Sequence, residues 1–292
     1  MSIQALRLPN LGSLWMLVAA MGFGIMGALV KLGATKFSSA ELVFYRSSFG
    51  LISIYAYIAY RKLPLRSPVL GMQISRALVG LVSLALFFYA IAHLHLATAI
   101  TLNYTSALFL AAFMPFLLHE KPKPILLAAV LLGFVGVTLL LRPSFTSTNA
   151  LAGAMGLLSG LGAALAYIHV KQLGKLHEPD WRTVFYFTGI STLVSGAWML
   201  FDDFATLAWQ DLPMLLGLGL SATIGQLAMT RAYRTGNTLI VASLAYTTVI
   251  FATLLGAFFW QEQLSLSEYI AIGIIILGGV ISVNSTPAKP AD

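Results

Sequence analysis

Six polar or aromatic side chains that can contact a small solute fall inside long apolar stretches of the chain. They are Tyr89, Asn103, Tyr104, Tyr167, Gln226 and Tyr246. Tyrosine offers a flat face to apolar groups and a hydroxyl that orients a ligand, and asparagine offers both a donor and an acceptor. Aromatic side chains also pack between helices, so each tyrosine alone has a purely structural interpretation. As a set, the tyrosines and Asn103 favour the wall of a solute site, whereas Gln226 is expected to bind either solute or another helix.

Two charged residues near the start of an apolar stretch are candidates for gating or coupling. A charge in the middle of a bilayer costs about 2.5–3.5 kcal/mol on insertion scales, so a retained charge usually faces protein or a water-filled cavity. Glu41 and Arg46 are five residues apart, and they therefore project to different sides of a helix. Arg46 either binds a carboxylate or gates a pathway, or it is a fixed cation satisfied by backbone carbonyls and Glu41. The second interpretation is favoured.

The histidines give a further candidate for coupling and no expected metal site. His169 lies near the end of an apolar stretch, where protonation near neutral pH could couple protons to the movement of a solute. Lys171 follows two residues later, so an interfacial histidine without a coupling role is favoured. His93 and His95 lie in a predicted turn, and the sequence places no further ligands beside them. With no cysteine in the chain, thiolate-bound metals are excluded, and no cofactor is expected.

The elements that position these residues must be membrane helices. Of the 292 residues, 59% are hydrophobic and 9% are charged, a composition that is incompatible with a surface exposed to water. The net charge is +7, but Lys and Arg occur singly or in pairs, so no nucleic-acid partner is expected. The chain has no phosphate-binding loop of the Gly-Lys-Ser/Thr type, so ATP is not expected to drive it directly.

The stretches between charges predict an all-α integral membrane protein with ten transmembrane helices. A helix needs about 20 apolar residues to cross a bilayer. The expected spans are 8–30, a segment from about 41 to 60, two spans within 77–119 joined at 93–95, 124–141, 143–170, 183–201, 212–230, 235–261 and 269–288. Inside these spans the only acid is Glu41, near an end, so an intramembrane enzyme is not expected.

The distribution of basic residues predicts the orientation. Thirteen of the 17 Lys and Arg residues and four of the ten acidic residues fall on the side of the N-terminus, so that side carries +9 and the other −2. Basic residues are retained on the cytoplasmic face. Both termini are therefore expected in the cytoplasm, with the chain crossing the cell (inner) membrane several times.

The second half of the chain repeats the first. A shift of 142 residues pairs Tyr104 with Tyr246, Glu120 with Glu262 and Gly136 with Gly278. The expected repeats are 1–142 with helices 1–5 and 143–292 with helices 6–10 and a short cytoplasmic tail. Five spans per repeat is an odd number, so the two copies must be inverted relative to each other. Inverted repeats are typical of secondary transporters that work by alternating access.

Three segments resemble the ten-helix, EamA-type branch of the drug/metabolite transporter (DMT) superfamily. They are Glu-Leu-Val-Phe-Tyr-Arg at 41–46, Leu-Asn-Tyr-Thr-Ser at 102–106 and Gly-Phe-Val-Gly-Val at 133–137. The resemblance covers about residues 10–285. It implies a carrier whose helices 3, 4, 6 and 9 line a central cavity. Ala107 departs from the proline that many members have there, so helix 4 is expected to be straighter at that point.

The resemblance and the candidate residues together predict export of a small metabolite. Arg46 is the only strong cation expected nearby and no carboxylate is expected at depth, so an uncharged or zwitterionic solute, best an amino acid, is predicted. An importer of another metabolite such as a nucleoside-type solute, or less probably a channel, is the alternative. Proton coupling is possible, and the protein is expected as a monomer or homodimer. Tyr104 and Tyr246 are predicted to face each other across the cavity, as one platform or as two gates.

Overall fold

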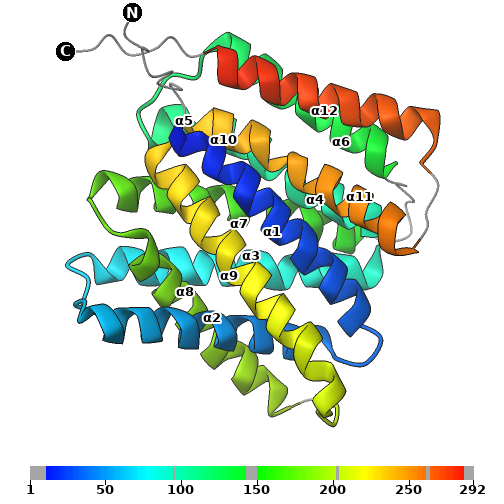
Figure 1. Cartoon of the computed structure of the whole chain (residues 1–292). Helices are drawn as coiled ribbons and strands as arrows, with labels where there is room; N and C mark the ends of the chain where they lie inside the picture. Colours follow the sequence, from blue (N-terminus) through cyan, green and yellow to red (C-terminus); the bar gives the residue numbers. More distant parts are fainter. Residues whose placement is uncertain (1–10, 95, 143–149, 202–203, 261–263, 286–292) are drawn as a thin grey trace, which may run out of the picture.

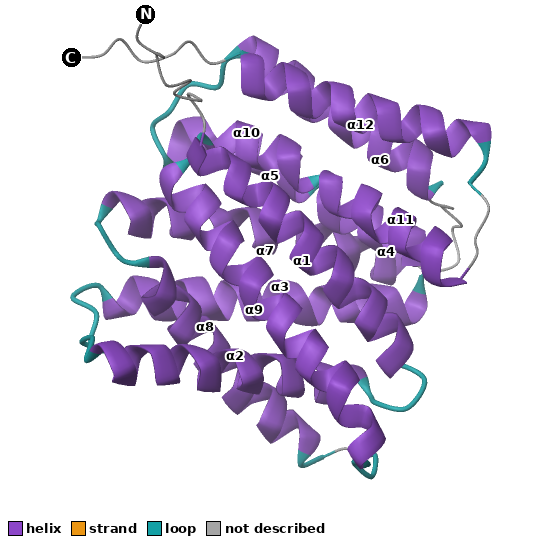
Figure 2. Ribbon diagram, viewed as in Figure 1, coloured by secondary structure: helices purple, strands orange, loops and turns teal. Residues whose placement is uncertain are grey.

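The computed structural model describes residues 11–285, except 95, 143–149, 202–203 and 261–263. Helices dominate the described residues, and no strand occurs among them (Figure 2). The helices are α1 (Leu11–Gly33), α2 (Ser39–Arg61), α3 (Leu70–His93), α4 (Leu96–Tyr104), α5 (Ser106–Leu117), α6 (Pro124–Leu141), α7 (Ala150–Lys175), α8 (Asp180–Met199), the 3-10 helix η2 (Trp209–Asp211), α9 (Leu212–Thr235), α10 (Thr238–Ala245), α11 (Thr247–Trp260) and α12 (Leu266–Asn284).

These helices form the ten spans that the sequence predicts, so the all-α membrane fold is confirmed. Nine segments of the described chain are long and apolar enough to cross a bilayer, with α4–α5 and α10–α11 each counting as one span. The tenth span is α8, which carries Asp180 and Arg182 in its first turn. The predicted turn between spans 3 and 4 also holds, because α3 ends at His93 and α4 begins at Leu96. His95, Gln261 and Glu262 lie outside the described residues.

Spans 4 and 9 are each interrupted at the repeated Tyr-Thr pair. The helix α4 ends at Tyr104 and α5 begins at Ser106, whereas α10 ends at Ala245 and α11 begins at Thr247. The hydroxyl of Thr105 donates to the carbonyl of Leu102 at 2.5 Å, and the hydroxyl of Thr247 donates to the carbonyl of Leu244 at 2.6 Å. Such bonds from Thr to the preceding turn compete with the backbone ladder and bend helices. Thr105 keeps right-handed helical dihedrals, with φ −59° and ψ −13°, so the interruption covers one residue within one span. The expectation of a straighter helix 4 at Ala107 stays a prediction.

The most extensive contacts between helices have counterparts related by the repeat. The helix α1 packs along α9, as α7 packs along α3; α2 packs on its own counterpart α8, and α6 on its counterpart α12 (Figure 1). This pattern is what a two-fold axis between inverted five-helix repeats produces. The inversion that the odd number of spans predicts is therefore present in the packing.

Glycines permit the closest of these contacts. A Cβ added at Gly136 of α6 would lie 3.1 Å from the carbonyl oxygen of Ala271 on α12. A Cβ added at Gly278 of α12 would lie 3.0 Å from the carbonyl oxygen of Ala129 on α6. Both pairs are related by the shift of 142 residues, so each helix offers the other the same glycine. Small residues allow such close backbone approach in membranes.

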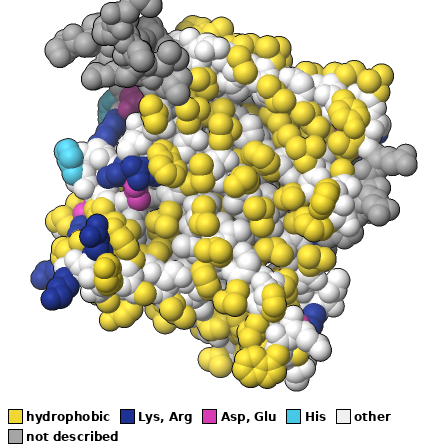
Figure 3. All heavy atoms as spheres, viewed as in Figure 1, with side chains coloured by type: hydrophobic (Ala, Val, Ile, Leu, Met, Phe, Trp, Pro, Cys, Tyr) yellow, Lys and Arg dark blue, Asp and Glu magenta, His cyan; other side chains and the backbone are white. Residues whose placement is uncertain are grey.

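Charged side chains gather at the two ends of the bundle. We call the end that holds the loops 62–69, 118–123 and 176–179 the basic end. Figure 3 shows apolar side chains over most of one face and charged ones gathered mainly at one edge. At the opposite end, Lys36 pairs with Asp211 at 2.5 Å. The charges predicted at residues 202 and 203 lie outside the described residues.

Candidate functional site

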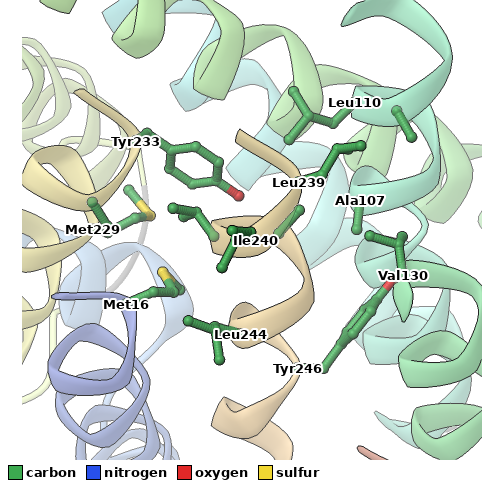
Figure 4. Packing of buried hydrophobic residues seen from close by; sticks show 14 of the residues in the cluster. Met16, Ala107, Leu110, Val130, Met229, Tyr233, Leu239, Ile240, Leu244 and Tyr246 are labelled. Carbon is green, nitrogen blue, oxygen red and sulfur yellow. The ribbon is translucent and has the colours of Figure 1, made fainter. Parts of the chain in front are cut away.

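A cavity of about 80 Å³ lies between the two repeats, where the broken spans cross α1, α7 and α9. Its wall is formed by Met16, Phe23, Asn103, Tyr104, Ser106, Ala107, Tyr167, Met229, Tyr233, Ala242, Ala245 and Thr248. Figure 4 shows Met16, Met229 and Tyr233 pointing toward one another beside the broken span. Three of the residues singled out in the sequence, Asn103, Tyr104 and Tyr167, belong to this wall.

Two tyrosines form the flat part of the wall. Tyr167 of α7 and Tyr233 of α9 stack with 4.6 Å between ring centroids and 11° between ring planes. Tyr233 was not predicted as a site residue, because it lies close to Arg231 and Arg234 in a segment interpreted as the inner end of a span. The structure instead holds α9 as a helix through Thr235, so Tyr233 is 1% exposed. Stacked rings offer a solute a rigid apolar surface.

Tyr104 and Tyr246 meet beside the cavity, with 5.8 Å between ring centroids. Tyr246 is fully buried and takes the space above Gly133, whose added Cβ would lie 2.6 Å from the Tyr246 ring. Its hydroxyl has no hydrogen-bond partner among the described residues. Tyr104 lines the cavity whereas Tyr246 stands behind it, so the two rings form one contact and not two separated gates.

Asn103 fixes the broken span to α7. Its amide Nδ2 donates to Ser159 Oγ at 3.1 Å, and Ser159 Oγ donates to the carbonyl of Gly156 at 2.6 Å. Ser83 of α3 donates to the carbonyl of Ser159 at 2.7 Å. This chain joins α3, α4 and α7 at the cavity wall. The carbonyl of the Asn103 side chain remains available as an acceptor.

Besides Tyr246, two more of the predicted solute-binding residues, Tyr89 and Gln226, lie outside the cavity wall. Tyr89 is 39% exposed on α3 and stacks on His93, with 4.2 Å between ring centroids. The prediction of Tyr89 as a cavity residue was wrong, because the rotation of α3 turns this side chain outward. Gln226 is buried on α9 and does not line the cavity, and its Nε2 has no hydrogen-bond partner among the described residues. It lies seven residues, or two turns, from Tyr233 and so on the same face of α9.

Glu41 caps a helix and does not compensate Arg46. The Glu41 carboxylate accepts from the backbone N–H of Ser38 at 2.8 Å and from that of Ala205 at 3.0 Å. The Ser38 hydroxyl accepts from the Glu41 N–H in return, which completes a capping box at the start of α2. Arg46 is half-buried and forms no ion pair or hydrogen bond with the described residues. The interpretation of Arg46 as a cation satisfied by Glu41 was therefore wrong.

His169 joins α7 to α3. Its Nδ1 lies 2.8 Å from the carbonyl oxygen of Leu165, and its Nε2 lies 3.1 Å from the hydroxyl of Ser75. A carbonyl only accepts, so Nδ1 carries a proton, whereas the Ser75 hydroxyl can either donate to Nε2 or accept from it. No group of three His, Cys, Asp or Glu residues suited to a metal occurs in the described part of the chain.

Arg76 is the residue that the sequence interpretation missed. It was assigned to a loop, but α3 begins at Leu70 and carries Arg76 into the bundle, where it is 3% exposed. Its Nε and Nη1 have no hydrogen-bond partner among the described residues. A buried unsatisfied donor costs roughly 1–3 kcal/mol, and more when it is charged. Defining spans as charge-free stretches could not find it, since that definition moves every charge out of the membrane.

Two ion pairs and a hydrogen bond link helix ends at the basic end, and two of these three contacts join the repeats. Arg234 of α9 lies 2.5 Å from Asp180 at the start of α8, and Lys175 of α7 lies 3.0 Å from Glu120 of the first repeat. Glu178 accepts from Gln73 of α3 at 2.9 Å.

Comparison with known proteins identifies the family. The model of the EamA-like transporter family matches residues 10–142 and 151–284. The chain belongs to the EamA-like transporter family. This EamA-like transporter therefore has two internal five-helix repeats, moves a small solute and crosses a membrane several times. A solved crystal structure superposes with a TM-score of 0.83 at 18% identity, covering 94% of this chain and 98% of that chain, which shows the shared fold alone.

Curated relatives of this EamA-like transporter are named transporters. The chain is 31% identical to the pseudopaline exporter CntI of Pseudomonas aeruginosa over 97% of this chain and 99% of that protein. It is 30% identical to an uncharacterized transporter of Helicobacter pylori, covering 91% and 92% of the two chains. A riboflavin transporter of Vibrio cholerae is 25% identical over 77% and 76% of the two chains.

Proposed function

We propose that this EamA-like transporter exports a small metabolite of the amino-acid type across the cell (inner) membrane by alternating access. The observation that carries the proposal is the tyrosine-walled cavity at the junction of the inverted repeats, beside the two broken spans. Solute sites of repeat-built transporters lie at such junctions, near broken helices. The similarity to a protein named as an exporter supports the outward direction.

Roles follow from position in the bundle. Tyr104, Tyr167 and Tyr233 contact the apolar or cationic part of the solute, and Asn103 binds a polar group. Arg46 and His169 are assigned to gating or coupling, with protons the candidate ion. The repeats divide at about 142/143, and both termini lie in the cytoplasm. All residues that line the cavity belong to one chain, so transport is expected from a monomer as well as from a homodimer.

Counterflow in proteoliposomes tests the proposal. Purified protein is reconstituted and loaded with amino acids, nucleosides or organic cations, and uptake of the labelled solute is followed. Tyr167→Ala is expected to lower the initial rate at least fivefold, because the stacked wall is lost. Tyr89→Ala, outside the cavity, is the matched control and is expected to retain the rate. No counterflow of any solute by wild-type protein would contradict the proposal.

The importer alternative is separated by the direction of net movement. Cells that overproduce the protein are expected to release solute faster and to tolerate higher internal concentrations. Faster accumulation from the medium would instead favour an importer of a metabolite such as a nucleoside-type solute. Rates that saturate with solute concentration separate a carrier from a channel.

A further inference from the structure

One face of the Arg76 guanidinium packs on an aromatic ring, and two of its N–H donor atoms, Nε and Nη1, have no partner among the described residues. Its central carbon lies 4.2 Å from the centroid of the Phe187 ring on α8. Contact with an aromatic face balances part of the charge, but it accepts none of the N–H bonds along the edge of the group. Nε and Nη1 are buried without a partner among the described residues. The edge of the guanidinium is therefore available to an acceptor.

The position of Arg76 is made by a glycine one turn further along α3. A Cβ added at Gly80 would lie 3.3 Å from Arg76 Nη1 and 3.3 Å from the Phe187 ring. The guanidinium thus lies beside Gly80, ten residues or roughly 15 Å along the axis from Leu70. Gly80 is seven residues, or about 10 Å along the axis, beyond Gln73, which bonds Glu178 at the basic end. Arg76 therefore places its charge inside the bundle, between the basic end and the helix centre.

The helix that carries Arg76 also supports the wall of the cavity. Ser83 lies two turns along α3 from Arg76 and on the same face, and it donates to the carbonyl of Ser159. The Ser159 hydroxyl accepts from Asn103, which lines the cavity. Arg76 is therefore on the side of α3 that packs against α7 and the cavity wall.

The interior of the bundle carries positive charge without matching acids. Arg46 and Arg76 both lack ion pairs to the described residues. Every described Asp and Glu lies near the end of a helix or in a loop: Glu41, Glu120, Glu178, Asp180, Asp211 and Glu268. A solute that brings negative charge is favoured at this depth, whereas an unaccompanied amino group finds no carboxylate there.

We propose that Arg76 binds a carboxylate of the solute and that the exported compounds carry more carboxylates than amino groups. The assignment rests on the proposed function. It narrows the proposed substrates from metabolites of the amino-acid type to those that carry a net negative charge. A guanidinium binds a carboxylate through two parallel hydrogen bonds. The tyrosine wall then contacts the remainder of the molecule.

Matched pairs of solutes test the assignment. Glutamate and glutamine, and succinate and succinamide, differ by replacement of carboxylates with amides of nearly the same shape. Each is used to drive counterflow and to compete against the labelled partner in proteoliposomes. Wild-type protein is expected to prefer the carboxylate of each pair at least tenfold. Arg76→Gln is expected to abolish the preference, while Arg66→Gln, an exposed loop arginine, is expected to keep it.

A conservative variant keeps the assignment falsifiable if Arg76→Gln fails to fold. Arg76→Lys retains the charge but loses the paired donors, so the preference is expected to fall several-fold while folded yield is kept. An unchanged preference in Arg76→Gln or Arg76→Lys would make Arg76 a structural cation held by Phe187 and would overturn the assignment. Wild-type counterflow of neutral zwitterionic amino acids, with glutamate and succinate inert, would overturn it too, while leaving the proposed function in place.

Discussion

The ring of Tyr167 lies parallel to the ring of Tyr233, 4.6 Å away between centroids. The stack joins α7 to α9 within the second repeat, and both tyrosines line the cavity. Each ring therefore holds the other in place, and the wall is rigid where a solute must fit. The two tyrosines are expected to act together in any measurement of transport.

Removal of the ring at position 233 tests this wall. Tyr233→Leu is expected to lower the initial rate of counterflow at least fivefold, because the stacked surface is replaced by a flexible side chain. Tyr233→Phe keeps the ring and is expected to retain more than half of the rate. Equal rates in Tyr233→Leu and wild type would show that the stack only fills space.

Tyr246 contributes packing that its partner Tyr104 does not. Tyr246→Ala is expected to destabilise the fold by about 3–5 kcal/mol, as truncation of a large buried ring does. Tyr246→Phe removes only a hydroxyl that has no partner among the described residues, so it is expected to be neutral or slightly stabilising. Tyr104→Ala is expected to reduce flux several-fold with little loss of folded yield. Thermal unfolding in detergent, together with counterflow, separates the three variants.

The seam between α6 and α12 gives a prediction about symmetry. Gly136→Ala and Gly278→Ala are both expected to destabilise by about 1–3 kcal/mol, since each added Cβ meets the backbone of the facing helix. Gly273→Ala in the same α12 meets nothing within 4 Å, so it is the matched control and is expected to be neutral or stabilising. A stable Gly278→Ala variant would contradict the close packing of the seam.

Cysteine labelling tests the orientation against a clean background, because the chain has no native cysteine. A membrane-impermeant thiol reagent is expected to label Gln210→Cys, at the end opposite to the basic end, in intact cells. Lys62→Cys at the basic end is expected to react only after the cells are opened. Both positions are exposed, so burial does not account for a difference. The reverse pattern would contradict the cytoplasmic placement of the termini.

The pair of Arg234 and Asp180 is expected to hold the basic end closed. Asp180→Asn and Arg234→Gln should each lower the unfolding temperature, and the double variant should lose less than the sum of the two. The coupling energy is expected to be about 0.5–3 kcal/mol, since the charges are only partly exposed. Strict additivity would show that the pair contributes nothing to closure.

The spans, their inversion and the meeting of Tyr104 with Tyr246 could be predicted from the sequence. Charge placement and the shift of 142 residues carry that information directly. The position of Arg76 could not be predicted, because hydropathy alone cannot tell a buried cation from one at a helix end. The prediction that Tyr89 lines the cavity was wrong for a related reason. Lipid is as apolar as the core, so hydropathy does not reveal which face of a span turns inward.

The breaks in spans 4 and 9 required knowledge of side-chain geometry. Thr105 and Thr247 each return a hydrogen bond to their own helix, and no proline marks either site. The cavity forms beside both breaks, so its place depends on two hydroxyl groups as well as on the tyrosines next to them. The repeat in the sequence pairs Thr105 with Thr247, but it does not show that each hydroxyl donates to a carbonyl of its own helix.

The glycine contacts between α6 and α12 are reciprocal: Gly136 approaches Ala271, and Gly278 approaches Ala129. A surface that binds its own copy across a two-fold axis is an isologous interface, the usual interface of homodimers. Two half-length chains inserted in opposite directions would bury the same glycine against the same alanine twice. The segment that connects the two repeats therefore links two units whose α6 and α12 surfaces are already complementary to each other.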